Sequence, residues 1–428
     1  SNVGIGKDAL GANTTGAENV ALGHEAFQAN TTASTGVAIG KSALKANTTG
    51  ANNVGIGYLA LTTNTTGADN VAVGRNALEL NTTASNNTAI GKEALYANTT
   101  GANNTASGYQ ALKANTTGHS NVGVGYQSLR SSTTATENTA VGFNALDANT
   151  TGANNTAIGN GALKLTTGNA NYNTAVGSKA LDANTTASNN TAVGYDALTA
   201  NTTGSANTAC GSYAADSVTT ASGITAIGNN ALNAVTTGSY NVGLGEAAGS
   251  YAVSLTTGSK NYLMGNYVHT SAVNSDAQMV FGYNVVGSGN STITVGNGTT
   301  DSTLSFGGTS WSAPSDIRYK KNIQDSTAGL SFVNDLRPVT YEWKDEGDLP
   351  EGHKARVEGS TTPYNNSNIN HGFIAQEVKT AIDNHSEIKD GFKMWSQDDY
   401  DDRQRVADGA IVPMLVKAIQ ELSTKNDA

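Results

Sequence analysis

The first half of the chain repeats with a period of 17 residues. Fifteen glycines mark this period, and 13 of the 14 intervals between them are 17 residues long, the exception being the 18-residue step from Gly159 to Gly177. The glycines are Gly6, Gly23, Gly40, Gly57, Gly74, Gly91, Gly108, Gly125, Gly142, Gly159, Gly177, Gly194, Gly211, Gly228 and Gly245. A strict short period is typical of a stacked array, in which each repeat contacts its neighbours, and it argues against a globular enzyme core.

Aligned on these glycines, the repeats form apolar columns. The residue before the glycine is mostly Ile, Val or Leu, the residue three before it is Val or Thr, and Gly or Ala stands between them. β-branched residues alternating with period two predict a short strand, and we expect the Ile/Val columns to form its buried face. A Leu column, represented by Leu44, follows four residues after the glycine, and each repeat ends in Asn-Thr-Thr-Gly/Ala, a turn composition.

We therefore predict one coil per repeat, stacked into a mainly β solenoid, a β-roll, over residues 1–250. At roughly 4.8 Å per coil, the 15 repeats would give a rod on the order of 70 Å long. Asparagine columns are predicted to form side-chain amide ladders between coils (Asn13, Asn30, Asn47, Asn64, Asn81, Asn98 and Asn115). A helical solenoid is disfavoured, because no 3.6-residue period is present and Gly, Asn and Thr are poor helix formers. Cys210, the only cysteine, stands in the Ile/Val column and is expected to be buried.

Charge is unevenly distributed along the chain. The net charge is −10, and residues 1–314 carry 10 Lys+Arg and 14 Asp+Glu, whereas the much shorter segment 315–428 carries 14 and 20. This rise in charge density predicts a domain boundary close to residue 315. The acidic balance, without a cluster of Lys and Arg, argues against a nucleic-acid partner. No apolar run approaches the length of a membrane-spanning helix, so no membrane insertion is expected.

A single rod of this kind would be marginally stable. Each coil buries about three apolar side chains in 17 residues, so we expect three copies to associate around a common axis. The repeated motif Asn-Val/Thr-Ala-Ile/Val-Gly resembles the head repeats of trimeric autotransporter adhesins, and the longer unit from Thr191 to Gly204 resembles repeats of phage tail-fibre proteins. These resemblances imply a homotrimeric β-roll.

After Gly245 the period fades. Residues 251–314 hold short apolar alternations separated by Gly, Asn and Ser, and we predict a β-rich transition that ends the rod. Exposed aromatic rings suit stacking on carbohydrate, so this segment is also a candidate receptor-binding tip; the alternative is that its rings belong to the core. The aromatic residues concerned are Tyr251, Tyr262, Tyr267, Tyr283 and Trp311.

The segment 315–428 predicts a small α/β domain. We expect a helix over Ser326–Leu336 with Ser326 as its N-cap, a strand over Val339–Lys344, and a strand turning into an amphipathic helix over His371–Ile382. The tail predicts a helix whose apolar residues follow the 3-4-3 spacing of a coiled-coil seam, namely Val412, Leu415, Ile419 and Leu422.

In this order, these segments resemble the endosialidase-type intramolecular chaperone domain at the C-terminus of phage tailspikes, tail fibres and neck appendages. The motif residues present are Ser315, Asp316, Arg318, Lys320 and the sequence from Gly372 to Val378, which includes Gln376 and Glu377. The resemblance implies that the domain drives the assembly of three chains. It also implies that the domain then cuts itself off between Pro314 and Ser315, in a single turnover that uses no metal and no cofactor.

In that reaction Ser315 is the implied nucleophile and Lys320 its base. A serine hydroxyl is a weak nucleophile until a base accepts its proton, and positive charge from Arg318 and Lys321 would favour the neutral amine that this base must be. The alternative is that Ser315 caps a turn and the domain only docks. His371, beside the second motif, is the one histidine for which a role in processing is considered.

The combined prediction is a structural phage tail fibre on the virion, extracellular after release. It has a shaft (residues 1–250), a transition (251–314) and a chaperone domain (315–428), and it binds a host-cell surface receptor, for which a glycan is one candidate. The alternative is a trimeric adhesin of the bacterial cell surface. The last residues, Glu421–Ala428, do not resemble the membrane anchor of such adhesins. A conventional enzyme is disfavoured, because the shaft shows no carboxylate pair, phosphate loop or Ser-His-Asp set.

Overall fold

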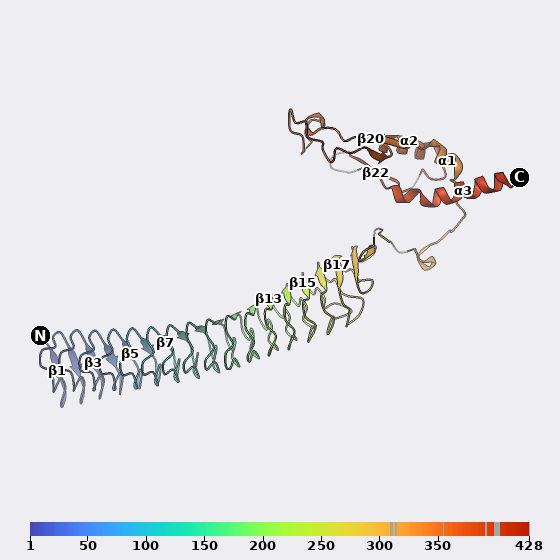
Figure 1. Ribbon diagram of the computed structural model, residues 1–428. Coiled ribbons are helices and arrows are strands. Elements are labelled where there is room, and N and C mark those ends of the chain that lie inside the picture. The colour runs from blue at the N-terminus through green and yellow to red at the C-terminus, as the bar shows by residue number, and fades with distance from the viewer. Residues whose placement is uncertain (309–310, 313–314, 354, 390–391, 398–402, 428) are drawn as a thin grey trace. The chain divides into compact units, whose positions relative to one another are not determined.

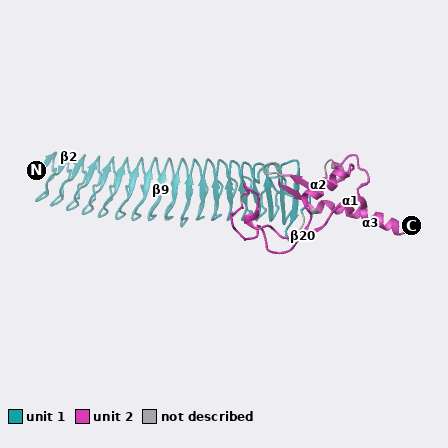
Figure 2. Cartoon of the chain, turned by 90° about the horizontal axis from the view of Figure 1, so that it is seen from above, with its two compact units in different colours: residues 1–314 teal, residues 315–428 magenta. Residues whose placement is uncertain are grey.

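The computed structural model describes the chain except residues 309–310, 313–314, 354, 390–391, 398–402 and 428. The chain forms two compact units, residues 1–314 and residues 315–428, which are coloured separately in Figure 2. The described residues are mainly β, and their three α-helices all lie in the second unit. None of the helices in this described part is both long and apolar enough to cross a membrane.

The first unit is a β-solenoid, as predicted (Figure 1). Each coil contributes one three-residue strand, and successive strands pair in parallel and in register, so that Val37 lies beside Val54 and Val54 beside Val71. The strands of the repeats are β1 Val3–Ile5, β2 Val20–Leu22, β3 Val37–Ile39, β4 Val54–Ile56, β5 Val71–Val73, β6 Thr88–Ile90, β7 Thr105–Ser107, β8 Val122–Val124, β9 Thr139–Val141, β10 Thr156–Ile158, β11 Thr174–Val176, β12 Thr191–Val193, β13 Thr208–Cys210, β14 Thr225–Ile227 and β15 Val242–Leu244.

The same sheet continues past residue 250. Three further parallel strands extend it, and a last strand then turns back antiparallel. They are β16 Tyr262–Met264, β17 Gln278–Gly282, β18 Thr292–Gly296 and β19 Asp301–Ser305. The loss of strict period in the sequence therefore reflects coils of changed length, which still stack on the coils before them.

Alanine and leucine form the core of the solenoid. The middle residue of nearly every repeat strand, usually Ala, is fully buried, whereas the flanking Val, Thr and Ile side chains are partly or largely exposed, as Ile90 is at 45%. The predicted burial of the Ile/Val columns is therefore wrong: the strands alternate with the predicted period, but the middle residue faces the interior and the Ile/Val side chains face outward. The interior has room only for a small residue at the middle position, because the Leu column fills it; a Cβ at Gly55 would lie 3.2 Å from Leu44 Cγ. Cys210, expected to be buried, is exposed for the same reason.

The periodic glycines are required by the stacking. At Gly108 φ is 141°, a conformation that strains any residue with a side chain. A Cβ there would lie 2.3 Å from the carbonyl oxygen of Gly125 in the next coil, well inside van der Waals contact. Each coil must therefore present a glycine at this point for its neighbour to approach.

Two columns of buried asparagine connect the coils. In the predicted ladder, Asn98 Nδ2 donates to Asn81 Oδ1 at 2.9 Å, and Asn115 Nδ2 donates to Asn98 Oδ1 at 2.8 Å. A second ladder, which was not predicted, lies just before the strands, where the Asn121 backbone N–H donates to Asn104 Oδ1 at 3.0 Å. Buried amides that satisfy one another supply order that so small an apolar core cannot supply alone.

The second unit is a small α/β domain. β20 Val339–Tyr341 pairs antiparallel with β21 Asn370–Gly372, and β22 Trp395–Gln397 pairs antiparallel with β23 Gln404–Val406. The helices are α1 Leu330–Asp335, α2 Ala375–Asn384 and α3 Val412–Asn426, with single 3₁₀ turns η1 Ile317–Tyr319, η2 Glu346–Asp348 and η3 Asp408–Ile411. Its core includes the buried side chains of Phe332, Val378, Ile382 and Met394.

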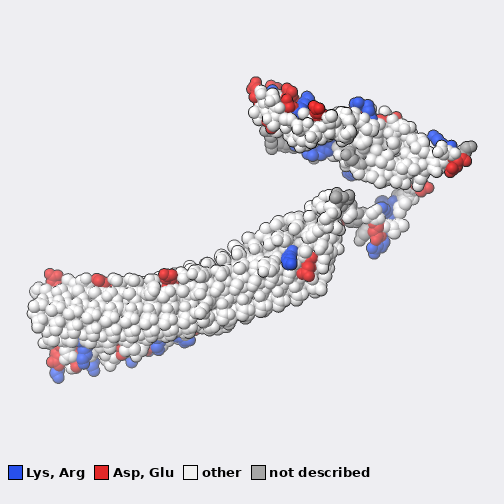
Figure 3. Space-filling view, viewed as in Figure 1, with Lys and Arg blue, Asp and Glu red and all other residues white. Residues whose placement is uncertain are grey.

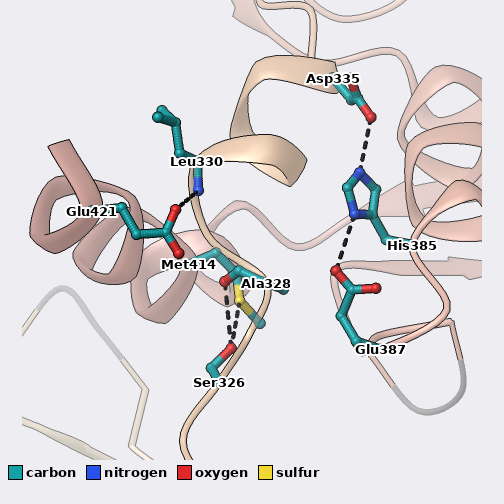
Figure 4. A network of polar contacts seen from close by, with 8 residues as sticks. All are labelled: Ser326, Ala328, Leu330, Asp335, His385, Glu387, Met414 and Glu421. Carbon is teal, nitrogen blue, oxygen red and sulfur yellow. Dashed lines mark hydrogen bonds and ion pairs between the residues drawn. The ribbon is translucent and has the colours of Figure 1, made fainter. Parts of the chain in front are cut away.

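Most predicted elements of this unit are present, but the predicted N-cap is wrong. The strand-to-helix segment and the C-terminal helix are confirmed, whereas α1 is shorter than predicted and starts at Leu330. Ser326 Oγ hydrogen-bonds Ala328 O instead of capping a helix. Glu421 of α3 takes the capping position, with its Oε2 accepting the Leu330 N–H at 2.9 Å (Figure 4).

Candidate functional site

Ser315 and Lys320 face each other at the start of the second unit. Lys320 Nζ lies 2.7 Å from Ser315 Oγ and donates a hydrogen bond to it. Both residues are exposed. A lysine ammonium can only donate in this contact, but a neutral amine at the same distance can accept the serine proton, which is the geometry a general base requires. Pro314, the predicted acyl side of the cut, lies outside the described residues.

Asp316 and Arg318 form an ion pair between the two members of this dyad. Arg318 donates to the Asp316 carboxylate from its backbone N–H at 2.8 Å and from its guanidinium, with Nη2 lying 2.6 Å from Oδ2. These Arg318 hydrogen bonds hold the pKa of Asp316 below its usual value, and the same contact raises the pKa of Arg318. The Arg318 guanidinium is thus paired with Asp316, and its role as positive charge beside Lys320 stays a prediction.

The residues of the second motif lie elsewhere in the unit. Gly372 ends β21 opposite Val339, and Gln376 and Glu377 lie in the first turn of α2. Glu377 pairs with Arg337, whose guanidinium lowers the pKa of this carboxyl group. Within the described part of the chain, no hydrogen bond or ion pair joins Gly372, Gln376 or Glu377 to Ser315 or Lys320. The structure thus gives these motif residues a place in the domain scaffold.

A histidine network that the sequence analysis missed joins the C-terminal ends of α1 and α2 (Figure 4). His385 Nε2 lies 2.9 Å from Asp335 Oδ2, and Nδ1 lies 3.1 Å from Glu387 Oε1. The ring also packs edge-on against Phe332. The hydrogen bond to Asp335 is the main cause that raises the pKa of His385. His371, the histidine considered from sequence, is an exposed residue of β21.

The aromatic residues of segment 251–314 are largely on the surface. Tyr251, Tyr262, Tyr283 and Trp311 are exposed. Tyr267 is half-buried between two of them, with its ring 5.1 Å from that of Tyr251 and 5.9 Å from that of Tyr283, both edge-on. Three tyrosines from successive coils therefore form one surface row.

The surface of the first unit carries few charges, as Figure 3 shows for one face. Among the described residues, no group of three His, Cys, Asp or Glu side chains is arranged to hold a metal ion.

Comparison with known families agrees with this location. Residues 315–387 match the family model described as the chaperone of endosialidase, and the match begins at the serine of the dyad. No curated protein and no solved structure matches the chain.

Proposed function

We propose that the protein is a tail-fibre shaft that assembles from three copies and is then cut, because residues 315–387 match the chaperone-of-endosialidase family model and a β-solenoid precedes them. In this proposal the second unit brings three shafts together. It then cleaves the chain between Pro314 and Ser315, which leaves the shaft on the virion.

The contact between Lys320 and Ser315 is the observation that supports cleavage. Ser315 Oγ attacks the carbonyl carbon of Pro314 while its proton passes to the Lys320 amine. The peptide C–N bond then breaks, the Ser315 nitrogen leaves with a proton, and an ester joins Pro314 to Ser315 Oγ. Water hydrolyses the ester, which restores the hydroxyl group and leaves a carboxylate on Pro314. Proximity supplies much of the acceleration, since nucleophile and carbonyl are neighbours in one chain.

Two uncovered apolar surfaces support association of three copies. The column of residues just before the periodic glycines exposes apolar side chains along the solenoid, among them Leu22, Ile90, Ile158 and Ile227. On α3, the seam residues Val412, Leu415, Ile419 and Leu422 are all exposed. Contiguous apolar stripes of this kind normally mark an interface, and identical stripes on identical chains suit a symmetric homo-oligomer.

Assembly also suggests how cleavage is timed. The dyad is open to solvent in the single chain, whereas a base of this kind works best where water is excluded. A neighbouring subunit that covers Ser315 and Lys320 would supply this exclusion. Cleavage would then follow assembly, and its rate in dilute chains would depend on protein concentration.

Attachment to a host surface is the proposed role of the assembled fibre. The row of Tyr251, Tyr267 and Tyr283 supports a carbohydrate ligand, because ring edges and faces at the surface can pack against sugar rings. A variant in which serine replaces all three tyrosines should still form the trimer but should no longer bind host cells. Unchanged binding would assign attachment to another part of the fibre.

Mass measurement after expression tests the cleavage. The wild-type chain should yield a fragment that begins at Ser315, whereas Ser315→Ala and Lys320→Ala should remain full length and still assemble. Lys344→Ala is the control, since it removes an exposed lysine to which no part in the reaction is assigned, and it should leave cleavage intact. Cleavage of Ser315→Ala at the same bond would refute the proposed nucleophile.

A further inference from the structure

Ser315 and Lys320 meet only because the chain between them folds back on itself. Five residues of extended chain would separate their Cα atoms by roughly 17 Å. The turn η1 shortens this path, with its Lys320 N–H donating to Ile317 O at 3.1 Å. A single turn of three residues does not hold its shape by its backbone alone, because nucleating a helical turn is unfavourable. Side-chain contacts must therefore support it.

Asp316 is the residue that closes the other end of this turn. It has the extended conformation of an N-cap, with φ −71° and ψ 138°, and its Oδ1 accepts the Arg318 backbone N–H at 2.8 Å. This bond satisfies a donor at the start of the turn, which is how N-caps stabilise helices. The Lys320 bond at one end and the Asp316 bond at the other together define the turn that brings the dyad together.

Arg318 in turn holds the carboxylate of Asp316. Its Nε lies 3.0 Å from both carboxylate oxygens and its Nη2 lies 2.6 Å from Oδ2. A guanidinium forked onto a carboxylate fixes the orientation of both groups. Among the described residues, every hydrogen bond to the Asp316 side chain comes from Arg318, so the contacts that fix Asp316 lie within the six residues from Ser315 to Lys320.

We infer that Asp316 is a positioning residue for the proposed self-cleavage, which acts by capping η1 so that Lys320 Nζ stays on Ser315 Oγ. The inference rests on the proposed function. It goes beyond it by assigning to Asp316 a cap of the Arg318 backbone N–H, a bond that an amide oxygen at the same reach can also accept. Asp316 makes no contact with the scissile bond in this role.

Three substitutions separate a cap from a charge. Asp316→Ala removes the cap and should slow cleavage by roughly 5- to 30-fold, the effect expected for loss of an N-cap. Asp316→Asn keeps an oxygen at the same reach, so its rate should stay within about threefold of wild type. Asp316→Glu keeps the charge but moves it one methylene away, and should cleave slowly, like the alanine variant. Two outcomes would overturn the inference. One is that Asp316→Ala cleaves as fast as wild type; the other is that Asp316→Asn cleaves slowly while Asp316→Glu cleaves fast.

A pH profile distinguishes positioning from a part in proton transfer. A positioning residue lowers the rate at every pH without moving the pH at which the rate rises, because the base remains Lys320. The expected profile of Asp316→Ala is therefore parallel to that of wild type. A displaced profile in Asp316→Asn would mean that the Asp316 charge acts on the base directly, and would overturn the capping role.

Amide hydrogen exchange tests the cap independently of cleavage. In the uncut Ser315→Ala chain, the Arg318 amide hydrogen should exchange slowly with solvent. Adding Asp316→Ala should speed this exchange by roughly 5- to 30-fold. Adding Asp316→Asn should leave it slow. If the wild-type chain is not cut while this pattern is found, the proposed function fails and the cap stands. If the wild type is cut and the Arg318 amide is indifferent to Asp316→Ala, the cap fails and the proposed function stands.

Discussion

Asn115 and Ser132 mark a break in the first asparagine ladder. Asn115 Nδ2 donates to Asn98 Oδ1 and so continues the row, but the next coil has Ser132 in the ladder position. Ser132 is buried, and its Oγ and the Oδ1 atom of Asn115 both lack a hydrogen-bond partner in the described part of the chain. A buried polar atom without a partner is a cost to stability, so the break is a weak point of the shaft.

Ser132→Asn is therefore expected to stabilise the shaft. The new Nδ2 can donate to Asn115 Oδ1 and restore the row, which should raise the free energy of unfolding by about 1 kcal/mol. Thermal unfolding of the uncut chain measures the effect. Ser131→Asn, one residue away and half-buried, is the matched control and should change little. A lower melting temperature for Ser132→Asn would show that the coil has no room for the longer side chain.

His385 predicts a pH dependence of the second unit. Its pKa is raised above the ordinary 6.5, chiefly by the hydrogen bond to Asp335, so the folded state binds this proton more tightly than the unfolded chain does. This contribution is complete below about pH 6.5 and disappears as the pH rises through the raised pKa. The melting temperature of wild type minus that of His385→Gln should therefore be largest near pH 6 and shrink toward pH 9. A difference that grows with pH would contradict this assignment.

The α3 helix and the solenoid strands share one property, an apolar face without a partner in the single chain. On α3, Ile419 is 65% exposed at the centre of the seam, whereas Ala418 beside it is buried, and the helix packs against α1. The helix thus packs inward on one side and presents leucine, isoleucine and valine outward on another. A helix of 15 residues is too short to associate strongly alone, so the proposed assembly requires contacts of the shaft as well.

Ile419→Lys should weaken association without unfolding the unit. A charge in an apolar seam loses its hydration on assembly, and this cost should weaken the affinity of association at least tenfold. Sedimentation of the uncut Ser315→Ala chain at several concentrations measures this. Gln420→Lys adds the same charge at the adjacent exposed position and should assemble as the parent does. Equal association of both variants would remove α3 from the interface.

The period of the sequence predicts the coil, but it cannot predict which side of the strand is inside. Alternation defines two faces and gives no phase. The phase is set by Leu44 and its equivalents, whose left-handed backbone, φ 51° at Leu44, turns them into the interior. No intrinsic preference of leucine predicts that conformation. The stacking of coils imposes this backbone conformation, and the sequence of a single repeat does not show it.

The candidate site divides in the same way. Ser315 and Lys320 are five residues apart, and a motif in the sequence is enough to pair them. The Glu421 cap of α1 joins residues 91 positions apart, and the Arg337–Glu377 pair joins residues 40 positions apart. No local sequence pattern predicts either contact. The Ser315–Lys320 pairing was therefore predictable from the family resemblance of a short motif, whereas the Asp316–Arg318 ion pair and the contacts that depend on how helices pack were not.

In the whole molecule, the shaft and the second unit have different tasks. The shaft buries alanines, leucines and asparagine ladders inside each coil and leaves its β-branched residues outside. These outer columns extend over the length of the repeats and expose apolar side chains such as Ile90 and Ile227. The second unit is the part that, in the proposed function, brings three such surfaces together before it is released.

The particle mass in solution tests this account most directly. Sedimentation equilibrium of the uncut Ser315→Ala chain should give three times the chain mass of 43.6 kDa, and residues 1–314 expressed alone should fail to form that soluble trimer. A folded, monodisperse particle of single-chain mass, from either protein, would contradict it, because the outer columns of the shaft would then be stable in water without partners.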